Sequence, residues 1–181
     1  MPDLIVIYGP PLAGKTTVAR ELGRAMEGKS AVVSADYLLN EAIARPDADR
    51  EAELALLEQQ VRLLTANYLK FRYNCIVEGP FIYENGGRLV NAESQIDQLL
   101  ALMRMMSLRR MIVRLTASEE ELARRARDTG RTAELGLALQ VNAAYRPRLS
   151  PELRVFNTGA HRPEDVVASV LSELPGMPLG R

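Results

Sequence analysis

A segment near the start of the chain has the composition and spacing of a phosphate-binding loop. It follows the apolar run at residues 4–8 and satisfies the pattern G-x-x-x-x-G-K-[ST]. The two glycines allow the backbone to curl so that successive amide hydrogens point at one anion, and a helix that begins there adds the positive end of its dipole. The pattern predicts a site for nucleotide phosphates formed by Gly9, Pro10, Pro11, Leu12, Ala13, Gly14, Lys15, Thr16 and Thr17.

Two side chains of this loop carry specific chemistry. Lys15 places a positive charge beside the β- and γ-phosphates, and Thr16 places a hydroxyl group where it can bind Mg²⁺. The alternative is a glycine turn with an incidental lysine. The sequence favours the phosphate site because the pattern stands between an apolar run and the helical stretch Val18 to Leu22, as a nucleotide-binding loop requires.

Short apolar runs alternate with helical sequence along the rest of the chain. The apolar runs lie at residues 4–8, 31–34, 74–77, 111–116 and 153–156. Because continuous apolar strands separated by helices form parallel sheets covered on both faces, the sequence predicts an α/β fold. Such sheets bind ligands beyond the carboxyl ends of their strands, so the residues that follow each run are the candidates for a site.

Several of the intervening helices have recognisable starts. Periodic apolar residues predict a long helix that begins near Asp49, and Ser118 with Glu121 has the spacing of a capping box. Pro163 is typical of the first turn of a last helix. We expect a loop over residues 81–88.

Composition argues against several classes of protein. The 181 residues suit one compact domain, and the 23 basic and 23 acidic residues balance, so no overall positive field attracts nucleic acid or a membrane surface. With one cysteine and one histidine, a zinc site and a Ser-His-Asp or Cys-His mechanism are poor expectations. No charged leader and no apolar stretch of membrane-spanning length is present, which predicts a cytoplasmic protein.

With its phosphate loop between strand and helix, the chain resembles the small P-loop kinases, the group that includes adenylate, shikimate and gluconate kinases, chloramphenicol phosphotransferase and the zeta toxins. The resemblance extends over residues 4–174, but its specific part is the loop. It implies a three-layer fold with a five-stranded parallel sheet in the order 2-3-1-4-5, and it implies ATP and Mg²⁺ as cofactors. It also implies a single kinase domain over residues 1–181, with an acceptor-binding region at about 37–72 and 79–92 and a lid at about 118–148.

The same resemblance suggests roles for two acids. Asp36 looks like the carboxylate that accepts the proton of the acceptor hydroxyl in many of these kinases, although it is also a candidate helix cap for residues 37–44. Glu78 ends the third apolar run at a place similar to a Walker B acid and to a glutamate of the zeta toxins. Support of the metal, binding of the acceptor, and simple capping of the next loop all remain open for Glu78.

Other candidate residues follow from position in the family pattern. Tyr37, Tyr83 and Arg88 are candidates to stack on the acceptor or to hydrogen-bond to it. In the lid, the resemblance indicates Arg125 and Arg131 as arginines that reach the transferred phosphoryl group, because a guanidinium binds phosphate oxygens in pairs. The alternative is a solvated helix whose acids pair with those arginines. Asn157 and Gly159 fall in a loop similar to the adenine-side loop of the family.

The residues and the resemblance together favour a kinase that transfers the γ-phosphoryl group of ATP to a hydroxyl of a small molecule. The acceptor could be an antibiotic, a sugar or sugar nucleotide, a nucleotide, or a nucleic-acid end, and the neutral net charge disfavours the last. A different class, a regulatory nucleotide-binding NTPase without transfer, is opposed by the absence of D-x-x-G and N-K-x-D patterns. The sequence does not fix the oligomeric state.

Overall fold

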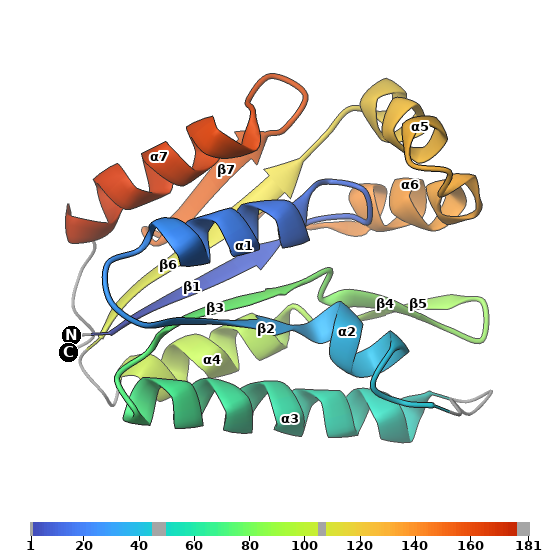
Figure 1. Cartoon of the computed structure of the whole chain (residues 1–181). Coiled ribbons are helices and arrows are strands. Elements are labelled where there is room, and N and C mark those ends of the chain that lie inside the picture. The colour runs from blue at the N-terminus through green and yellow to red at the C-terminus, as the bar shows by residue number, and fades with distance from the viewer. Residues whose placement is uncertain (1, 45–49, 105–107, 177–181) are drawn as a thin grey trace.

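A five-stranded parallel sheet forms the centre of the protein (Figure 1). The computed structural model describes residues 2–44, 50–104 and 108–176. The strands of the large sheet lie in the order β2-β3-β1-β6-β7. Their bounds are β1 Asp3–Tyr8, β2 Ser30–Ser34, β3 Asn74–Gly79, β6 Arg109–Thr116 and β7 Leu153–Asn157. Numbered among themselves along the chain, these strands have the order 2-3-1-4-5, so the expected topology is confirmed.

Helices cover both faces of this sheet, and a hydrophobic core lies between the sheet and the helices on each face. Their bounds are α1 Lys15–Ala25, α2 Ala35–Asn40, α3 Glu51–Lys70, α4 Ser94–Arg104, α5 Glu119–Asp128, α6 Leu135–Ala144 and α7 Pro163–Glu173, with short 3₁₀ turns Thr132–Glu134 and Leu174–Gly176. Alternate residues of β1 face opposite layers, as a parallel strand buried on both sides requires. Ile5 and Ile7 pack in the core that α1 and α7 cover, whereas Leu4 and Val6 pack in the core that α3 and α4 cover (Figure 1).

The helix starts agree with the sequence in two cases and differ in a third. Pro163 begins α7, and the Ser118 hydroxyl oxygen accepts a hydrogen bond from the Glu121 amide at the start of α5. The cap of α2 is Ser34, whose hydroxyl oxygen accepts from the Tyr37 amide, so the interpretation of Asp36 as the helix cap is wrong. Asp36 lies inside the first turn instead, and the predicted start near Asp49 falls outside the described residues.

The expected loop over residues 81–88 is also wrong. An antiparallel hairpin occupies this segment, with β4 at Ile82–Asn85 and β5 at Arg88–Asn91. Its two-residue turn is Gly86-Gly87, and both glycines have positive φ, at 57° and 79°. A glycine pair between two short runs is the signal of such a turn, because only glycine adopts this backbone without strain. Among the described helices, none is long and apolar enough to span a membrane.

A buried ion pair joins the edge strand β7 to its neighbour β6. Nε and Nη2 of Arg110 donate to Oε1 of Glu152 at 3.0 and 2.9 Å, and the Ser150 hydroxyl donates to Oε2 at 2.5 Å. The two charged side chains are only 8% and 7% exposed. Removal of one partner would therefore leave the other charge buried without compensation.

We expect Glu152→Gln to lower the free energy of unfolding by about 3 kcal/mol, because the Arg110 guanidinium would lose its counter-charge in a buried place. Urea unfolding followed by circular dichroism measures the change. Glu164→Gln on the exposed surface of α7 is the matched control and should change stability by less than about 0.5 kcal/mol. Equal unfolding midpoints for the two variants would contradict the importance of this pair.

Candidate active site

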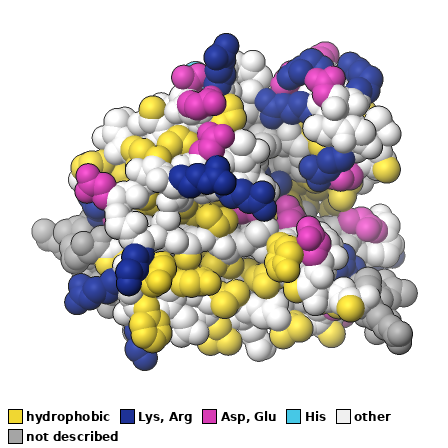
Figure 2. Space-filling view, in the orientation of Figure 1, with side chains coloured by type: hydrophobic (Ala, Val, Ile, Leu, Met, Phe, Trp, Pro, Cys, Tyr) yellow, Lys and Arg dark blue, Asp and Glu magenta, His cyan; other side chains and the backbone are white. Residues whose placement is uncertain are grey.

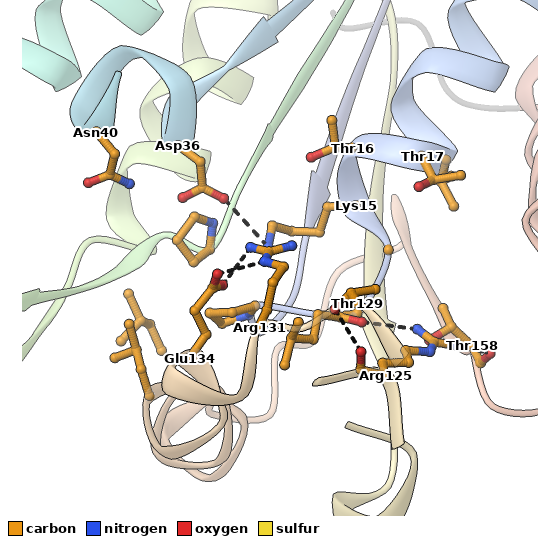
Figure 3. A pocket seen from close by; sticks show the side chains of 18 of the residues that line it. Lys15, Thr16, Thr17, Asp36, Asn40, Arg125, Thr129, Arg131, Glu134 and Thr158 are labelled. Atoms are coloured by element: carbon orange, nitrogen blue, oxygen red, sulfur yellow. Dashed lines mark hydrogen bonds and ion pairs between the residues drawn. The ribbon is translucent and has the colours of Figure 1, made fainter. Parts of the chain in front are cut away.

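The carboxyl ends of the central strands open into a cavity of about 730 Å³ (Figure 3). Its walls come from the phosphate loop after β1, from α2 after β2, from the segment that joins β3 to β4, from the α5–α6 region, and from the loop after β7. Five segments distant in sequence thus meet at one edge of the sheet, where parallel α/β folds bind ligands.

The phosphate loop is held by a close approach between two strands. A side-chain carbon added at Gly9 would lie 2.3 Å from the backbone oxygen of Leu115 on β6, so only glycine fits there. Gly14 has φ of 89° and precedes the first turn of α1. The loop therefore ends at a helix N-terminus whose first residues line the cavity, the arrangement that binds phosphate.

Lys15 is the buried cation of this loop. Its side chain is 5% exposed, its Nζ donates to the backbone oxygen of Pro10 at 3.1 Å, and it lies 3.7 Å from Oδ2 of Asp36. Asp36 is 40% exposed and reaches the cavity from α2 (Figure 3). The structure thus brings together the expected phosphate-binding cation and the expected acceptor-side carboxylate.

Glu78 lies beneath the loop at the end of β3. The Thr16 hydroxyl donates to its Oε1 at 3.3 Å, whereas Oε2 is buried and makes no hydrogen bond among the described residues. Burial raises the pKa of the Glu78 carboxyl, and the nearby Lys15 ammonium opposes that rise. A hydroxyl and an incompletely bonded carboxylate side by side are oxygen donors of the kind that Mg²⁺ prefers. The described residues contain no larger cluster of acids, histidines and cysteines that could hold a metal.

Arg125 links two loops. Its Nη1 donates to the backbone oxygen of Leu12 at 3.1 Å and to the Thr158 hydroxyl at 3.0 Å, its Nη2 donates to the Thr158 backbone oxygen at 2.6 Å, and its Nε pairs with Glu121 at 2.6 Å. Most of its donors are therefore used by protein atoms. In this arrangement Arg125 fixes the phosphate loop against the loop after β7.

Arg131 extends into the cavity from the turn after α5. Its Nε and Nη2 pair with the two carboxylate oxygens of Glu134 at 2.6 and 2.5 Å. The hydrogen bonds with Glu134 and the charge of nearby Asp36 raise the pKa of the Arg131 guanidinium, which is labelled in the close view (Figure 3). Half of the side chain is exposed, and a single neighbouring carboxylate holds it in this position.

The remaining sequence candidates lie in different surroundings. Tyr83 is a wall of the cavity at 4% exposure, and burial together with the charges of Asp36 and Glu78 raises the pKa of its hydroxyl. Tyr37 is exposed and lines an adjoining groove beside β2. Arg88 is exposed on β5 and lines neither hollow, so the structure does not bring it to the site.

The loop after β7 meets the cavity through Thr158, which lies between the two residues expected there. The Asn157 side-chain oxygen accepts a hydrogen bond from the Gly159 amide at 2.9 Å, which shapes the turn, but neither residue lines the cavity. Thr158 between them does, together with His161. Thr158 follows the fifth apolar run, where sheets of this kind bind ligands.

Other wall residues lie within the segments expected for the acceptor and the lid, although they were not named individually. Arg50 carried no motif, and its place depends on contacts with α2 that only the tertiary fold creates. Glu134 could have been inferred, because it stands three residues after Arg131, at the spacing of a local ion pair. The further members are Asn40, Glu41, Glu84, Thr129 and Leu137.

Comparisons with known proteins agree with this geometry. The sequence matches a protein family described as AAA domain over residues 4–144, whereas no curated protein matches the chain. A gluconokinase from Sinorhizobium meliloti is 21% identical with a TM-score of 0.61, and the alignment covers 97% of this chain and 93% of the gluconokinase. A sugar kinase from a Janibacter species is 15% identical with a TM-score of 0.61, at coverages of 98% and 96%. The tunicamycin resistance protein of Deinococcus radiodurans is 17% identical with a TM-score of 0.65, at coverages of 100% and 99%.

We expect Gly9→Ala to weaken the binding of MgATP by about tenfold or more, because the new methyl group would push the loop away from Leu115. Titration calorimetry measures the affinity. Gly136→Ala in α6 is the matched control, since nothing lies within 4 Å of its added carbon, and its affinity should equal that of the parent protein. Equal affinities for both variants would contradict the close fit at Gly9.

Glu78→Gln should stabilise the ligand-free protein at neutral pH. Because the pKa of Glu78 is raised in the folded state, the folded protein binds a proton more tightly than the unfolded chain. Stability is therefore lost as pH rises from the unfolded pKa through the folded one. Urea unfolding from pH 4 to pH 8 should show this loss in the parent protein and a weaker one in the variant. A variant that is less stable at pH 7 would contradict the expectation.

Proposed function

The chain belongs to the AAA domain family, and from this membership and the geometry of its cavity we propose that it is a kinase that transfers the γ-phosphoryl group of ATP to a hydroxyl group of a small molecule. The observation that carries the proposal is the distance of 3.7 Å between the Lys15 ammonium and the Asp36 carboxylate at the mouth of the phosphate loop. A phosphate-binding cation and an acceptor-side base must lie this close for phosphoryl transfer, in which positioning contributes most of the catalysis.

The residues present fit a nucleotide and its metal. The tight packing of Gly9 fixes the start of the loop, whose residues 11–17 line the cavity, and Lys15 would neutralise phosphate charge there. Thr16 and Glu78 would hold Mg²⁺ through the hydroxyl and through the carboxylate oxygen that makes no other hydrogen bond. When bound, MgATP supplies the phosphoryl group and a divalent charge on its oxygens. Mg²⁺ keeps several waters in such sites, so two protein ligands suffice.

Asp36 would act on the acceptor. Its carboxylate is accessible from the cavity and is oriented by Lys15, so it can accept a hydrogen bond from the acceptor hydroxyl and take its proton as the new bond forms. Once phosphate oxygens approach Lys15, they compete with Asp36 for the ammonium. Binding of the nucleotide would then release Asp36 toward the acceptor.

The two lid arginines would divide their roles. Arg131 would leave Glu134 to reach the transferred phosphoryl group, because it lines the same cavity and lies close enough to Asp36 to feel its charge. Arg125 would keep its hydrogen bonds to Leu12 and Thr158 and so hold the phosphate loop and the loop after β7 in fixed relative positions. We place the acceptor between α2 and the β4–β5 hairpin, within residues 37–72 and 79–92, and the lid within residues 118–148.

Asp36→Asn should reduce phosphoryl transfer by about 100-fold or more, because an amide cannot accept the proton of the acceptor, and it should leave MgATP affinity nearly unchanged. A mass-shift screen over hydroxyl-bearing metabolites and antibiotics identifies the acceptor, and steady-state kinetics compares the variants. Asp97→Asn, at the exposed surface of α4, is the control with full turnover. Full turnover of the Asp36 variant would refute the role of Asp36 as the general base. Failure of the parent protein to bind MgATP would refute the proposed kinase activity.

A further inference from the structure

A buried tyrosine outside the cavity wall contacts two of the segments that form the site. Tyr145 directly follows α6 and is 8% exposed. Its hydroxyl donates to the backbone oxygen of Pro80 at 2.5 Å, and its ring lies edge-on against Tyr8 with the ring centroids 5.5 Å apart. Pro80 follows β3 and lines the cavity, whereas Tyr8 ends β1 directly before Gly9 of the phosphate loop. One side chain thus joins the end of the α5–α6 region to two strands that carry the site.

Neighbouring groups fix the position of the Tyr145 hydroxyl. The Arg114 guanidinium lies over the ring of Tyr145, 4.9 Å from its centroid, and Tyr8 packs on that ring at an interplanar angle of 75°. Both are favourable arrangements for an aromatic ring. The side-chain amide of Asn142 donates to the backbone oxygen of Ala117 at 3.4 Å, which anchors the same end of α6 to the segment after β6. Burial raises the pKa of the Tyr145 hydroxyl, so this group stays protonated and acts as a donor at neutral pH.

The Pro80–Phe81 turn, which receives this hydrogen bond, has an unfavourable backbone. Phe81 has φ of 53°, in the left-handed region that a bulky residue rarely adopts. Such a conformation persists only where the surrounding structure holds it, and it is most frequent at functional sites. The Ala92 amide donates to the Phe81 backbone oxygen at 2.9 Å, and among the described residues only Tyr145 donates to the Pro80 oxygen. Removal of the Tyr145 hydroxyl would therefore release one side of a strained turn.

The position of this turn affects the acceptor side of the cavity. A side-chain carbon added at Gly79 would lie 2.7 Å from the side-chain carbon of Ala35, so the end of β3 packs directly against the start of α2. Asp36 is the next residue of α2, and Pro80 and Ile82 line the cavity. Figure 2 shows the surface hollowed below the α5–α6 region, between acidic side chains over α2 and over the β4–β5 hairpin. A shift of the turn would therefore move the cavity wall relative to Asp36.

The nucleotide side of the cavity does not depend on this hydrogen bond. The phosphate loop is fixed by the close approach of Gly9 to Leu115, and Arg125 bonds it to the loop after β7. An acceptor hydroxyl, in contrast, must lie in line with the γ-phosphate, where a displacement of about 1 Å costs about 100-fold in rate. A loosened turn would therefore impair use of the acceptor and leave nucleotide binding unchanged.

We propose that Tyr145 is a positioning residue for the acceptor. Its hydroxyl holds the strained Pro80–Phe81 turn in one conformation, and the turn keeps the acceptor wall at the distance from Asp36 that transfer requires. This inference rests on the proposed function and adds a residue that touches neither substrate, since Tyr145 does not line the cavity. Because Tyr145 directly follows α6, the same hydrogen bond ties the end of the α5–α6 region to the acceptor wall.

Tyr145→Phe removes the hydroxyl and keeps the ring with its packing. In the ligand-free protein, hydrogen–deuterium exchange at residues 81–83 and at the Ala92 amide should become about tenfold faster than in the parent protein, because the turn opens more often. Residues 4–8 of β1 should exchange at the parent rate. Tyr73→Phe is the matched control, since Tyr73 directly precedes β3, at the opposite end of that strand, and it should leave both regions unchanged. Equal exchange in Tyr145→Phe and the parent protein would overturn the proposal.

Kinetics distinguishes positioning from a general loss of stability. For each hydroxyl compound that the mass-shift screen identifies, Tyr145→Phe should lower kcat/KM about tenfold, while the calorimetric affinity for MgATP stays within about twofold of the parent value. Tyr73→Phe should change neither constant, and urea unfolding checks that both variants are folded. Unchanged kcat/KM in Tyr145→Phe, or an equal loss of MgATP affinity, would overturn the proposal and leave the kinase standing. Absence of transfer by the parent protein to every compound of the screen, while MgATP still binds, would overturn both.

Discussion

The contact between the backbone of Gly9 and the carbonyl of Leu115 sets the position of everything else in the site. At this contact the end of β1 lies so close to β6 that any side chain at Gly9 would collide with the Leu115 carbonyl. The chain must then turn over the edge of the sheet and enter α1 at Lys15, so that residues 11–17 line one hollow. Because the sheet fixes the ends of its strands relative to one another, Asp36 after β2 and Glu78 on β3 reach the same hollow.

Several charged side chains of the cavity pair with one another. Lys15 lies by Asp36, and Arg131 lies by Glu134. These pairs are partly exposed, so each is weak and can exchange its partner for a phosphate at small cost. The buried pair of Arg110 and Glu152 is different, because its members have no access to a ligand and serve to hold β7 in the sheet. Exposure therefore separates pairs that can open for function from pairs that hold the fold.

The fold and the phosphate site could be predicted because their signals are local. Apolar runs predict parallel strands, and the loop pattern predicts the phosphate site. The strand order was implied only by the resemblance to the small P-loop kinases, and it agrees with the structure, as does the grouping of Lys15, Thr16, Asp36 and Glu78 at the strand ends. The β4–β5 hairpin was missed although Gly86-Gly87 indicated it. Arg50 could not be predicted, since its partners Asn40 and Leu39 come from another helix. Likewise, the bonds of Arg125 to Leu12 and Thr158 join residues more than thirty positions apart.

The β4–β5 hairpin forms a sheet of its own and makes no strand pair with the five central strands. It nevertheless contributes Tyr83 and Glu84 to the cavity. Changes in this hairpin can thus remodel the ligand wall without altering the hydrogen bonds that hold the phosphate loop. Such a division allows one nucleotide-binding scaffold to acquire new specificities through drift in a small flap, while the phosphate loop stays unchanged.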